Sequence, residues 1–266
     1  MYAVSLAGSD AESALGRLSD AIDGRVGVVR TDAVESDGGQ VLTRGTTTYV
    51  VDNGWRASGD DCSVRDAIDR LAPDHEYAFV LGTPAVRLPR IVVGDCEANR
   101  DDESDEPLVS VADVTELDVD ETIGLIHGTE PYETLESLVA AVKRSDRATY
   151  SGAIATFTGR VRAKEDDADE RTHYLEFEKY EGVAERRMAD IESDLEEREG
   201  VLDVRLHHRT GNIPDGEDIV FVVVLAGHRE EAFEAVRDGI NRLKDEVPLF
   251  KKEVTVDDEF WVHEQS

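Results

Sequence analysis

A short acidic stretch divides the chain into two parts, and this division constrains the fold more than any other feature. Ala98 to Glu106 have the sequence Ala-Asn-Arg-Asp-Asp-Glu-Ser-Asp-Glu, and Pro107 follows them. A segment this polar cannot bury enough apolar surface to form a core of its own, and proline favours a break. We therefore predict a linker over 98–118, between an N-terminal domain at 1–97 and a C-terminal domain at 119–266.

The N-terminal part alternates apolar runs with amphipathic segments. Leu15, Leu18 and Ile22 recur at the spacing of one helix face, and Val64, Ile68 and Leu71 mark a second helix. Between and after them come short apolar runs, which we interpret as buried strands: 2–7, 25–30, 77–81 and 90–93. Strands separated by helices predict a small α/β domain with a parallel or mixed sheet.

The C-terminal part has a different order of elements. It contains runs that alternate or are continuously apolar, which predict strands at 153–161, 172–180, 202–206, 219–226 and 250–256. Helical periodicity is found at 132–144, 184–195 and 233–243, and Asn212 to Gly216 has the composition of a turn. This mixed order predicts an α+β domain with a largely antiparallel sheet.

The charge of the chain limits its partners. It carries 60 acidic residues against 29 basic ones, a net charge of −31, and the acids are spread along its length. This pattern favours a halophilic protein that works in molar salt over one with a special acidic role, such as mimicry of a nucleic acid. A nucleic-acid binder would need a basic stripe, and we see none. We also see no signal peptide and no apolar run long enough to span a membrane.

Two cysteines, Cys62 and Cys96, lack the spacing of a metal site or a CxxC motif. We expect both to be small buried or semi-buried side chains in a reducing compartment. Together with the lack of a targeting segment, this predicts a cytoplasmic protein, and we expect neither a metal nor a cofactor.

Lysine is rare and clustered. Only six lysines occur, against 23 arginines, and three of them, Lys244, Lys251 and Lys252, fall within nine residues. An amine can change its protonation state or form a covalent bond, which a guanidinium effectively cannot. The cluster therefore suggests amine chemistry, although a helix-end lysine followed by two solvated strand lysines would have the same spacing.

Two further basic pairs lie at strand ends. Arg160 and Arg162 end the run from Ala153 and project from one face, while His228 and Arg229 stand between an apolar strand and the next helix, where backbone N–H groups favour anions. Salt bridges to the many carboxylates, and a capping role for His228, are the alternatives. If these groups converge with the lysines, they suit a phosphorylated, anionic small molecule.

Five motifs in order give the C-terminal part a recognisable pattern. They are Ala153–Arg162 (AIATFTGRVR), Leu175–Tyr180 (LEFEKY), Ile213–Glu217 (IPDGE), Gly227–Arg229 (GHR) and Leu243–Glu253 (LKDEVPLFKKE). Over roughly residues 121–261 the chain resembles the large, catalytic subunit of molybdopterin synthase, the MoaE family. The resemblance implies an α/β hammerhead-type fold and a sulfurtransferase of molybdenum cofactor biosynthesis, which makes the dithiolene of molybdopterin.

The resemblance also implies partners and residue roles. A small ubiquitin-like subunit, MoaD-like, would bring a C-terminal Gly-Gly thiocarboxylate, and sulfur would pass to cyclic pyranopterin monophosphate. A homodimer, and a heterotetramer with the small subunit, would share parts of each pocket between neighbours. By position, Lys244 and Lys251 match the catalytic lysines. Substrate-binding positions match Arg160, Val161, Arg162, His228, Arg229, Lys252 and Glu253.

Residues 1–94 resemble a second family more loosely, the P-loop adaptor MobB, through the opening strand, Gly24–Val29 and Leu71–Asp74. A phosphate loop needs G-x-x-x-x-G-K-[ST]. Here Glu12 stands where the second glycine would be and Ser13 where the lysine would be. We therefore predict a scaffold that neither binds nor hydrolyses nucleotide, and its own role stays open.

Two other functions compete with sulfur transfer. The C-terminal part could be a non-catalytic module that docks the sulfur carrier or cofactor intermediates, with the basic cluster as a recognition patch. The N-terminal part could instead use a nucleotide, if Glu12 and Ser13 were tolerated in the loop.

Overall fold

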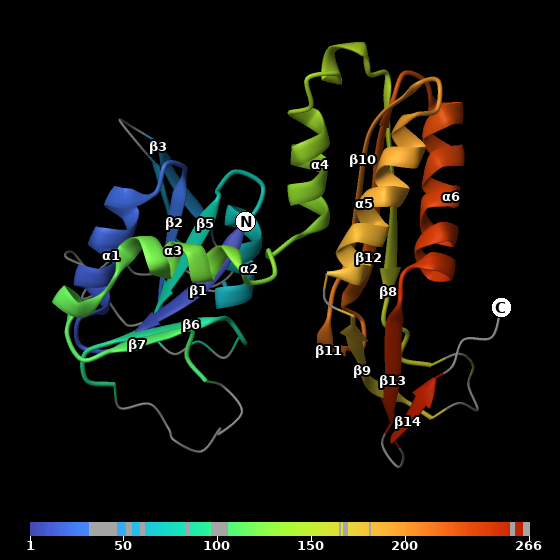
Figure 1. Cartoon of the computed structure of the whole chain (residues 1–266). Coiled ribbons are helices and arrows are strands. Elements are labelled where there is room, and N and C mark those ends of the chain that lie inside the picture. Colours follow the sequence, from blue (N-terminus) through green and yellow to red (C-terminus); the bar gives the residue numbers. More distant parts are fainter. Residues whose placement is uncertain are drawn as a thin grey trace. The chain divides into compact units, whose positions relative to one another are not determined.

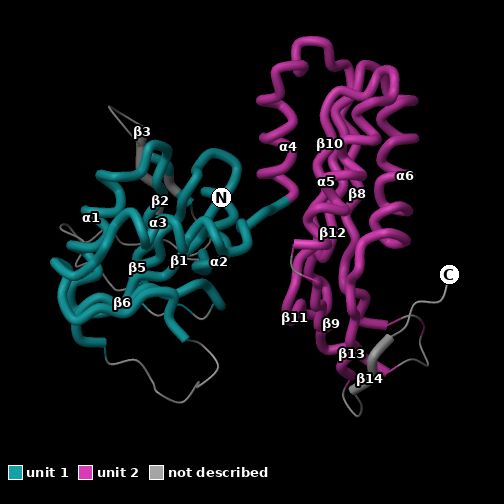
Figure 2. Tube along the Cα trace, in the orientation of Figure 1, with its two compact units in different colours: residues 1–134 teal, residues 135–266 magenta. Residues whose placement is uncertain are grey.

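The computed structural model contains two compact units, residues 1–134 and 135–266 (Figure 2). It describes residues 1–31, 47–51, 55–58, 62–82, 84, 86–96, 106–164, 166, 170–180, 182–255 and 259–262. Residues 98–105 of the predicted acidic linker lie outside the described residues. Within the described residues, no helix has the length and apolarity needed to cross a membrane.

Unit 1 is built on a five-stranded parallel sheet in the order β2-β5-β1-β6-β7, with a separate β3–β4 hairpin (Figure 1). Its strands are β1 (Tyr2–Ala7), β2 (Val26–Arg30), β3 (Thr48–Val51), β4 (Trp55–Ser58), β5 (Tyr77–Leu81), β6 (Arg90–Val93) and β7 (Val109–Val111). Its helices are α1 (Ala11–Ala21), α2 (Val64–Leu71), η1 (Val114–Glu116) and α3 (Val119–His127).

Alternation along the strands gives this sheet two apolar faces. Leu6 and Phe79 pack with Leu18 of α1 and Ile126 of α3 in one cluster. Ala78 and its neighbours pack with α2 on the other face. Helices therefore cover both faces, as a parallel sheet requires, and the prediction of an α/β arrangement for this part is confirmed.

Unit 1 extends further along the chain than the predicted boundary at residue 97. β7 continues the sheet, because Ile91 pairs with Val109. Helix α3 contributes Ile126, which is fully buried in the cluster formed with α1. These contacts assign residues 109–127, expected partly as linker and partly as C-terminal domain, to the N-terminal unit.

Unit 2 contains two antiparallel sheets, in the orders β10-β12-β8 and β11-β9-β13-β14 (Figure 1). The strands are β8 (Ala153–Arg160), β9 (Thr172–Lys179), β10 (Val201–His208), β11 (Gly211–Pro214), β12 (Asp218–Ala226), β13 (Leu249–Thr255) and β14 (Glu259–Val262). The helices are α4 (Leu135–Lys143), η2 (Ala148–Tyr150), α5 (Val183–Glu196) and α6 (Arg229–Glu246).

The three-stranded sheet of unit 2 is covered on both faces. Leu138 and Val142 of α4 pack on Val223 of β12, while α5 and α6 pack on the opposite face through residues such as Ile191 and Leu243. A mixed α/β architecture with antiparallel sheets is thus confirmed. The expected turn over Asn212–Gly216 was partly wrong, since residues 211–214 form edge strand β11, in which only Ile213 is buried.

The β1–α1 connection of unit 1, where we predicted a defective phosphate loop, is bonded to the end of β6. The N–H groups of Ser9 and Asp10 donate to the carbonyl oxygens of Asp95 (2.9 Å) and Val93 (3.1 Å). Gly8 has φ +104°, and a Cβ there would lie 2.2 Å from the Val93 oxygen, so only glycine fits. Backbone donors of the kind that hold phosphate in a P-loop are here engaged by the protein itself.

One expectation about the cysteines was wrong. Both are free and Cys96 is partly buried, but Cys62 is exposed, because it directly precedes Ser63, the surface N-cap of α2.

Candidate active site

Three predicted site residues stand where β8 ends. Arg160 is the last residue of the strand, and its guanidinium forms an ion pair with Asp218 (Nε to Oδ1, 3.1 Å) and donates to the carbonyl of Gly216. Val161 is buried, and its N–H donates to the carbonyl of Glu217 at 2.9 Å. Arg162 is exposed. Arg160 and Arg162 therefore extend from a backbone segment that is hydrogen-bonded to residues 216 and 217 through Val161.

Strand β13 presents its three predicted residues on alternate faces. Lys251 lies opposite Phe177 of β9, on the face that leads to the core. Lys252 lies on the other face and forms an ion pair with Glu176 (3.7 Å). The carboxylate of Glu253 accepts a hydrogen bond from the hydroxyl of Thr172. All three are half-buried.

Lys244 occupies the last turn of α6, just before the chain enters β13. It is exposed, and it lies seven residues before Lys251. Neither lysine forms an ion pair or hydrogen bond with any of the described residues. In a chain with 60 acidic residues, two amines without carboxylate partners among the described residues stand out.

The ends of β8 and α6 and the start of β13 lie at the same end of the three-stranded sheet (Figure 1). We call this region the basic corner. It comprises Arg160, Val161, Arg162, Lys244, Lys251, Lys252 and Glu253. Whether Lys244 and Lys251 share one cavity stays a prediction, but seven of the nine predicted residues belong to this corner.

His228 and Arg229 lie at the opposite end of the same sheet. β8 and β12 are antiparallel, and Ala226 pairs with Ala153, the first residue of β8. From Arg229 the helix α6 runs 15 residues to Lys244, which at 1.5 Å per residue is about 22 Å. One chain therefore does not bring these two residues to the basic corner.

The environment of His228 leaves its side chain available. It is the N-cap residue of α6, with φ −136°, but its ring makes no capping hydrogen bond, so the alternative of a capping histidine is not supported. Among the described residues, Arg229 forms one ion pair, with Glu230 at 3.7 Å, in which both side chains are 80% exposed. Pairs this exposed contribute little, and both residues can turn to an anion.

Chemically, the basic corner can hold an anion and supply an amine. Arg160 and Arg162 offer planar donors for a phosphate or carboxylate, and the two lysines can act as nucleophile or as acid and base. Sequence reasoning missed Asp218 and Thr172, which bind the side chains of Arg160 and Glu253. Their partners are 58 and 81 positions away along the chain, and no short motif links them.

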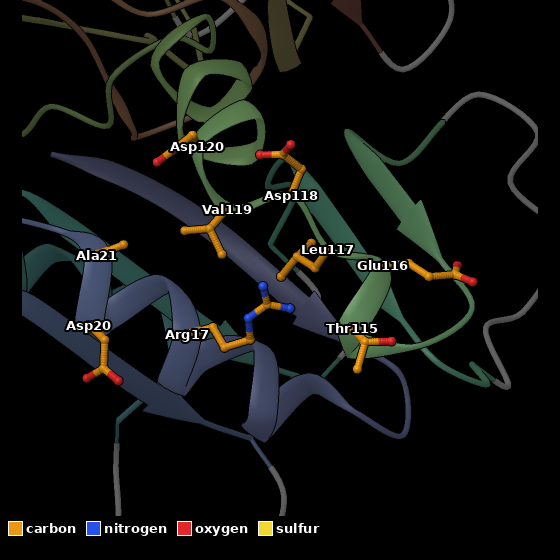
Figure 3. Close-up of a pocket in the computed structure, with 9 residues that line it drawn as sticks. All are labelled: Arg17, Asp20, Ala21, Thr115, Glu116, Leu117, Asp118, Val119 and Asp120. Atoms are coloured by element: carbon orange, nitrogen blue, oxygen red, sulfur yellow. The ribbon is translucent and has the colours of Figure 1, made fainter.

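An open depression of about 670 Å³ lies elsewhere, in unit 1, between α1 and the segment that leads into α3 (Figure 3). It contains none of the predicted site residues. Its single arginine, Arg17, donates to the carbonyl of Val114, and its Asp118 caps α3 by accepting the N–H of Glu121 at 3.0 Å. The lining is Arg17, Asp20, Ala21, Thr115, Glu116, Leu117, Asp118, Val119 and Asp120. With four acidic residues against one arginine, this surface does not suit an anionic substrate.

Comparisons with known proteins agree on one family. Residues 129–246 match the model of the MoaE protein family. The chain is 45% identical over 270 residues to a "Probable molybdopterin synthase" of Haloferax volcanii, covering all of both chains. It is 39% identical over 116 residues to a "Molybdopterin synthase catalytic subunit" of Halalkalibacterium halodurans, covering 44% of this chain and 73% of the relative. A solved molybdopterin synthase from Staphylococcus aureus is 31% identical, with a TM-score of 0.43, over 51% of this chain and 93% of that one.

Proposed function

The chain belongs to the MoaE family, the catalytic subunits of molybdopterin synthase, and we propose that it transfers sulfur to cyclic pyranopterin monophosphate. It is a sulfurtransferase enzyme. The sulfur donor in this proposal is the C-terminal Gly-Gly thiocarboxylate of a small, ubiquitin-like, MoaD-like subunit. Two successive transfers make the dithiolene of molybdopterin and leave two carrier carboxylates.

The observation that carries the proposal is a pair of amines, Lys244 and Lys251, in a chain of net charge −31. Neither amine has a carboxylate partner among the described residues, and both belong to elements that meet the end of β8, where Arg160 and Arg162 lie. In about 1 M salt the Debye length is roughly 3 Å, so only cations in direct contact can hold an anionic substrate. The reaction joins a phosphate-bearing pterin to an anionic thiocarboxylate. Cations in contact offset the free energy of bringing these two anions together.

Each residue has a proposed role. Arg160, Val161 and Arg162 bind the pterin phosphate, and Lys252 and Glu253 position the substrate from β13. Lys244 and Lys251 are the catalytic amines. One of them moves a proton between donor and pterin or holds the carrier's carboxyl end as a covalent adduct. His228 and Arg229 complete the anion site.

The enzyme in this proposal is a homodimer, and a heterotetramer once each chain has bound a small subunit. Support comes from the position of His228 and Arg229. A site that uses them together with Lys244 needs a second chain, because α6 holds them about 22 Å away within one chain. Unit 2 then has the α/β hammerhead-type fold of the family, and the protein works in the cytoplasm in molar salt.

Reconstitution tests the proposal. The purified protein, the thiocarboxylated carrier and cyclic pyranopterin monophosphate are mixed in molar salt, and molybdopterin is measured after oxidation to a fluorescent derivative. We expect multiple turnovers per chain as fresh carrier is supplied, and no product with a carboxylate carrier. Tight binding of the carrier without any product would instead identify a non-catalytic docking module and end the proposal.

For unit 1 we propose a scaffold derived from a P-loop fold that has lost its nucleotide site. The parallel sheet and the engaged N–H groups of Ser9 and Asp10 support this assignment. Glu12, at the position where a phosphate loop needs glycine, forms an ion pair with Arg30 of β2. A carboxylate at that position repels phosphate.

A further inference from the structure

A short turn joins the two sheets of unit 2. β11 of the four-stranded sheet ends at Pro214, and β12 of the three-stranded sheet begins at Asp218 (Figure 1). We call residues 214–218 the junction turn. They overlap the IPDGE motif, which has no role in the proposed reaction so far. Because β8 and β13 of the basic corner belong to different sheets, the junction turn connects the sheets that carry the two parts of the site.

The backbone of the junction turn is bonded to the end of β8. The N–H of Val161 donates to the carbonyl oxygen of Glu217, and the N–H of Gly216 donates to the carbonyl oxygen of Val161, both at 2.9 Å. Gly216 has φ +81°, a conformation that favours glycine. This reciprocal pair of hydrogen bonds fixes the turn against the residue that follows Arg160.

The junction turn is also held from two other strands. The N–H of Asp215 donates to the carbonyl oxygen of His173 in β9 at 3.0 Å, and the carboxylate of Asp215 forms an ion pair with Arg171. Arg209, which follows β10, donates to the carbonyl oxygen of Asp218 at 2.7 Å. With bonds to three strands, the acceptors of the turn are in place before a ligand binds.

The guanidinium of Arg160 binds the turn through one edge. Its Nε lies 3.1 Å from Oδ1 of Asp218, and its Nη2 donates to the carbonyl oxygen of Gly216. Nε and Nη2 form one edge of the planar group, whose N–H donors have a fixed geometry. The edge formed by Nη1 and Nη2 binds no other described residue. Fixing the first edge therefore orients the second, which can bind two oxygens of a phosphate in parallel.

Stability does not account for the ion pair of Arg160 and Asp218. The two side chains are 64% and 42% exposed, and pairs this exposed contribute little to folding, least of all in molar salt. A carboxylate beside an anion site also repels a bound phosphate. Asp218 therefore lies where it opposes substrate binding, unless orienting Arg160 more than offsets the repulsion.

We propose that Asp218 and the carbonyl oxygen of Gly216 are positioning groups, which hold the guanidinium of Arg160 so that its Nη1–Nη2 edge binds the pterin phosphate. The inference rests on the proposed substrate, cyclic pyranopterin monophosphate. Without Asp218, Arg160 keeps its charge but samples more rotamers, and this freedom is lost when the substrate binds.

The alternative, in which Asp218 is only an acidic neighbour, predicts an effect of opposite sign. Removing an acceptor that positions Arg160 weakens phosphate binding, whereas removing a repelling charge strengthens it. The sign of the change in affinity therefore distinguishes the two roles.

Calorimetric titration of the full chain with cyclic pyranopterin monophosphate, in molar salt and without carrier, measures this sign. We expect Asp218→Ala to raise the Kd at least about tenfold, the size of one hydrogen bond to a charged group. Asp218→Asn is the matched control. It keeps an acceptor oxygen and loses the charge, so its Kd should equal that of the wild type or lie below it. With saturating carrier, Asp218→Ala should raise KM by the same factor and leave kcat unchanged.

A double-mutant cycle tests whether Asp218 acts through Arg160. In the Arg160→Ala background, Asp218→Ala should cause no further rise in Kd, because the group that it positions is gone. Denaturant unfolding of Asp218→Ala should have the midpoint of the wild type, which separates positioning from a loss of structure.

The outcomes distinguish this inference from the proposed function. An unchanged or lower Kd in Asp218→Ala, or the same rise in the Arg160→Ala background, would overturn the positioning role and leave sulfur transfer by the wild type untouched. A wild type that binds the pterin and gives the expected pattern of variants, but makes no molybdopterin, would overturn the proposed function alone. No binding of the pterin by the wild type would overturn both.

Discussion

The two units of this chain differ in whether the hydrogen-bond donors at their candidate sites already have partners within the protein. In unit 1, the N–H groups at the β1–α1 connection donate to the carbonyls of Val93 and Asp95. In unit 2, the amines of Lys244 and Lys251 have no partner among the described residues. All six lysines lie after residue 142, so unit 1 has none. Amines without a carboxylate partner among the described residues are unexpected in a chain this acidic, and we infer that the chemistry belongs to unit 2 alone.

The largest expected effect is the loss of sulfur transfer when a lysine of the basic corner, but not a lysine elsewhere, is replaced. Lys244→Ala or Lys251→Ala should lower sulfur transfer at least about 100-fold, because each removes an amine that no neighbour replaces. The measurement is the turnover of cyclic pyranopterin monophosphate with saturating carrier. Lys143→Ala, which removes the same charge from an exposed position at the end of α4, should leave turnover unchanged. Wild-type turnover by the Lys244→Ala/Lys251→Ala double variant would show that these amines of unit 2 do not carry the chemistry.

The second prediction tests whether the site is shared between chains. Arg162→Ala and His228→Ala should each be nearly inactive, since each removes an anion contact from every site. Mixed and re-associated in equal amounts, they should recover about a quarter of wild-type turnover. Half of the dimers are then mixed, and each mixed dimer has one site with both residues intact. No recovery, with exchange of chains verified by a mass tag, would assign both residues to one chain.

The separation of the two basic pairs within one chain is also where sequence reasoning reached its limit. The motifs at Arg160–Arg162 and Gly227–Arg229 both follow strands, and convergence seemed natural on that ground. β8 and β12 are antiparallel, however, so the two basic pairs that follow them lie at opposite ends of the sheet. Pairing direction is a tertiary property, and neither strand's own residues encode it.

The elements themselves were more predictable than their grouping. Short apolar runs placed β1, β5 and β6 at the bounds that the structure has. Helix α3 was missed as part of unit 1, although Val119, Ile123 and Ile126 have helical spacing, because the polar stretch before it suggested a domain boundary. Its burial against α1 depends on a contact more than 100 residues away in sequence, which local patterns do not reveal.

A smaller effect contrasts a buried acid of unit 2 with an exposed one of unit 1. Burial is the largest cause that raises the pKa of Glu192 to about 7; the N–H of Leu206 and Arg205 oppose it, while Glu196 and Asp203 add to it. A folded-state pKa above the ordinary value near 4.5 means that the fold prefers the protonated acid. Stability is therefore lost as the pH rises from about 4.5 through 7.

Glu192→Gln should remove this loss. We expect it to stabilise unit 2 at pH 8 relative to pH 5 by on the order of 2 kcal/mol, after a discount for partial exposure, measured by denaturant unfolding at both pH values. Glu12→Gln in unit 1, where the acid is exposed in an ion pair with Arg30, should show no such pH dependence. Equal pH profiles for the wild type and Glu192→Gln would show that the buried carboxylate carries no penalty.

The smallest expected effect is a null one, and it tests unit 1 directly. GTP with Mg²⁺ should give no heat of binding in calorimetry and no rise in the melting temperature, because the backbone donors of Ser9 and Asp10 are engaged and no lysine is available for phosphate. A ligand at 100 times its Kd would stabilise by about 2.7 kcal/mol, a shift that is easily measured. The reverse substitution sharpens the point: Glu12→Gly/Ser13→Lys restores the residue types of a phosphate loop but not its free N–H groups. If the double variant then bound GTP, the defect would lie in the side chains alone, and the hydrogen bonds to Asp95 and Val93 would not be what prevents binding.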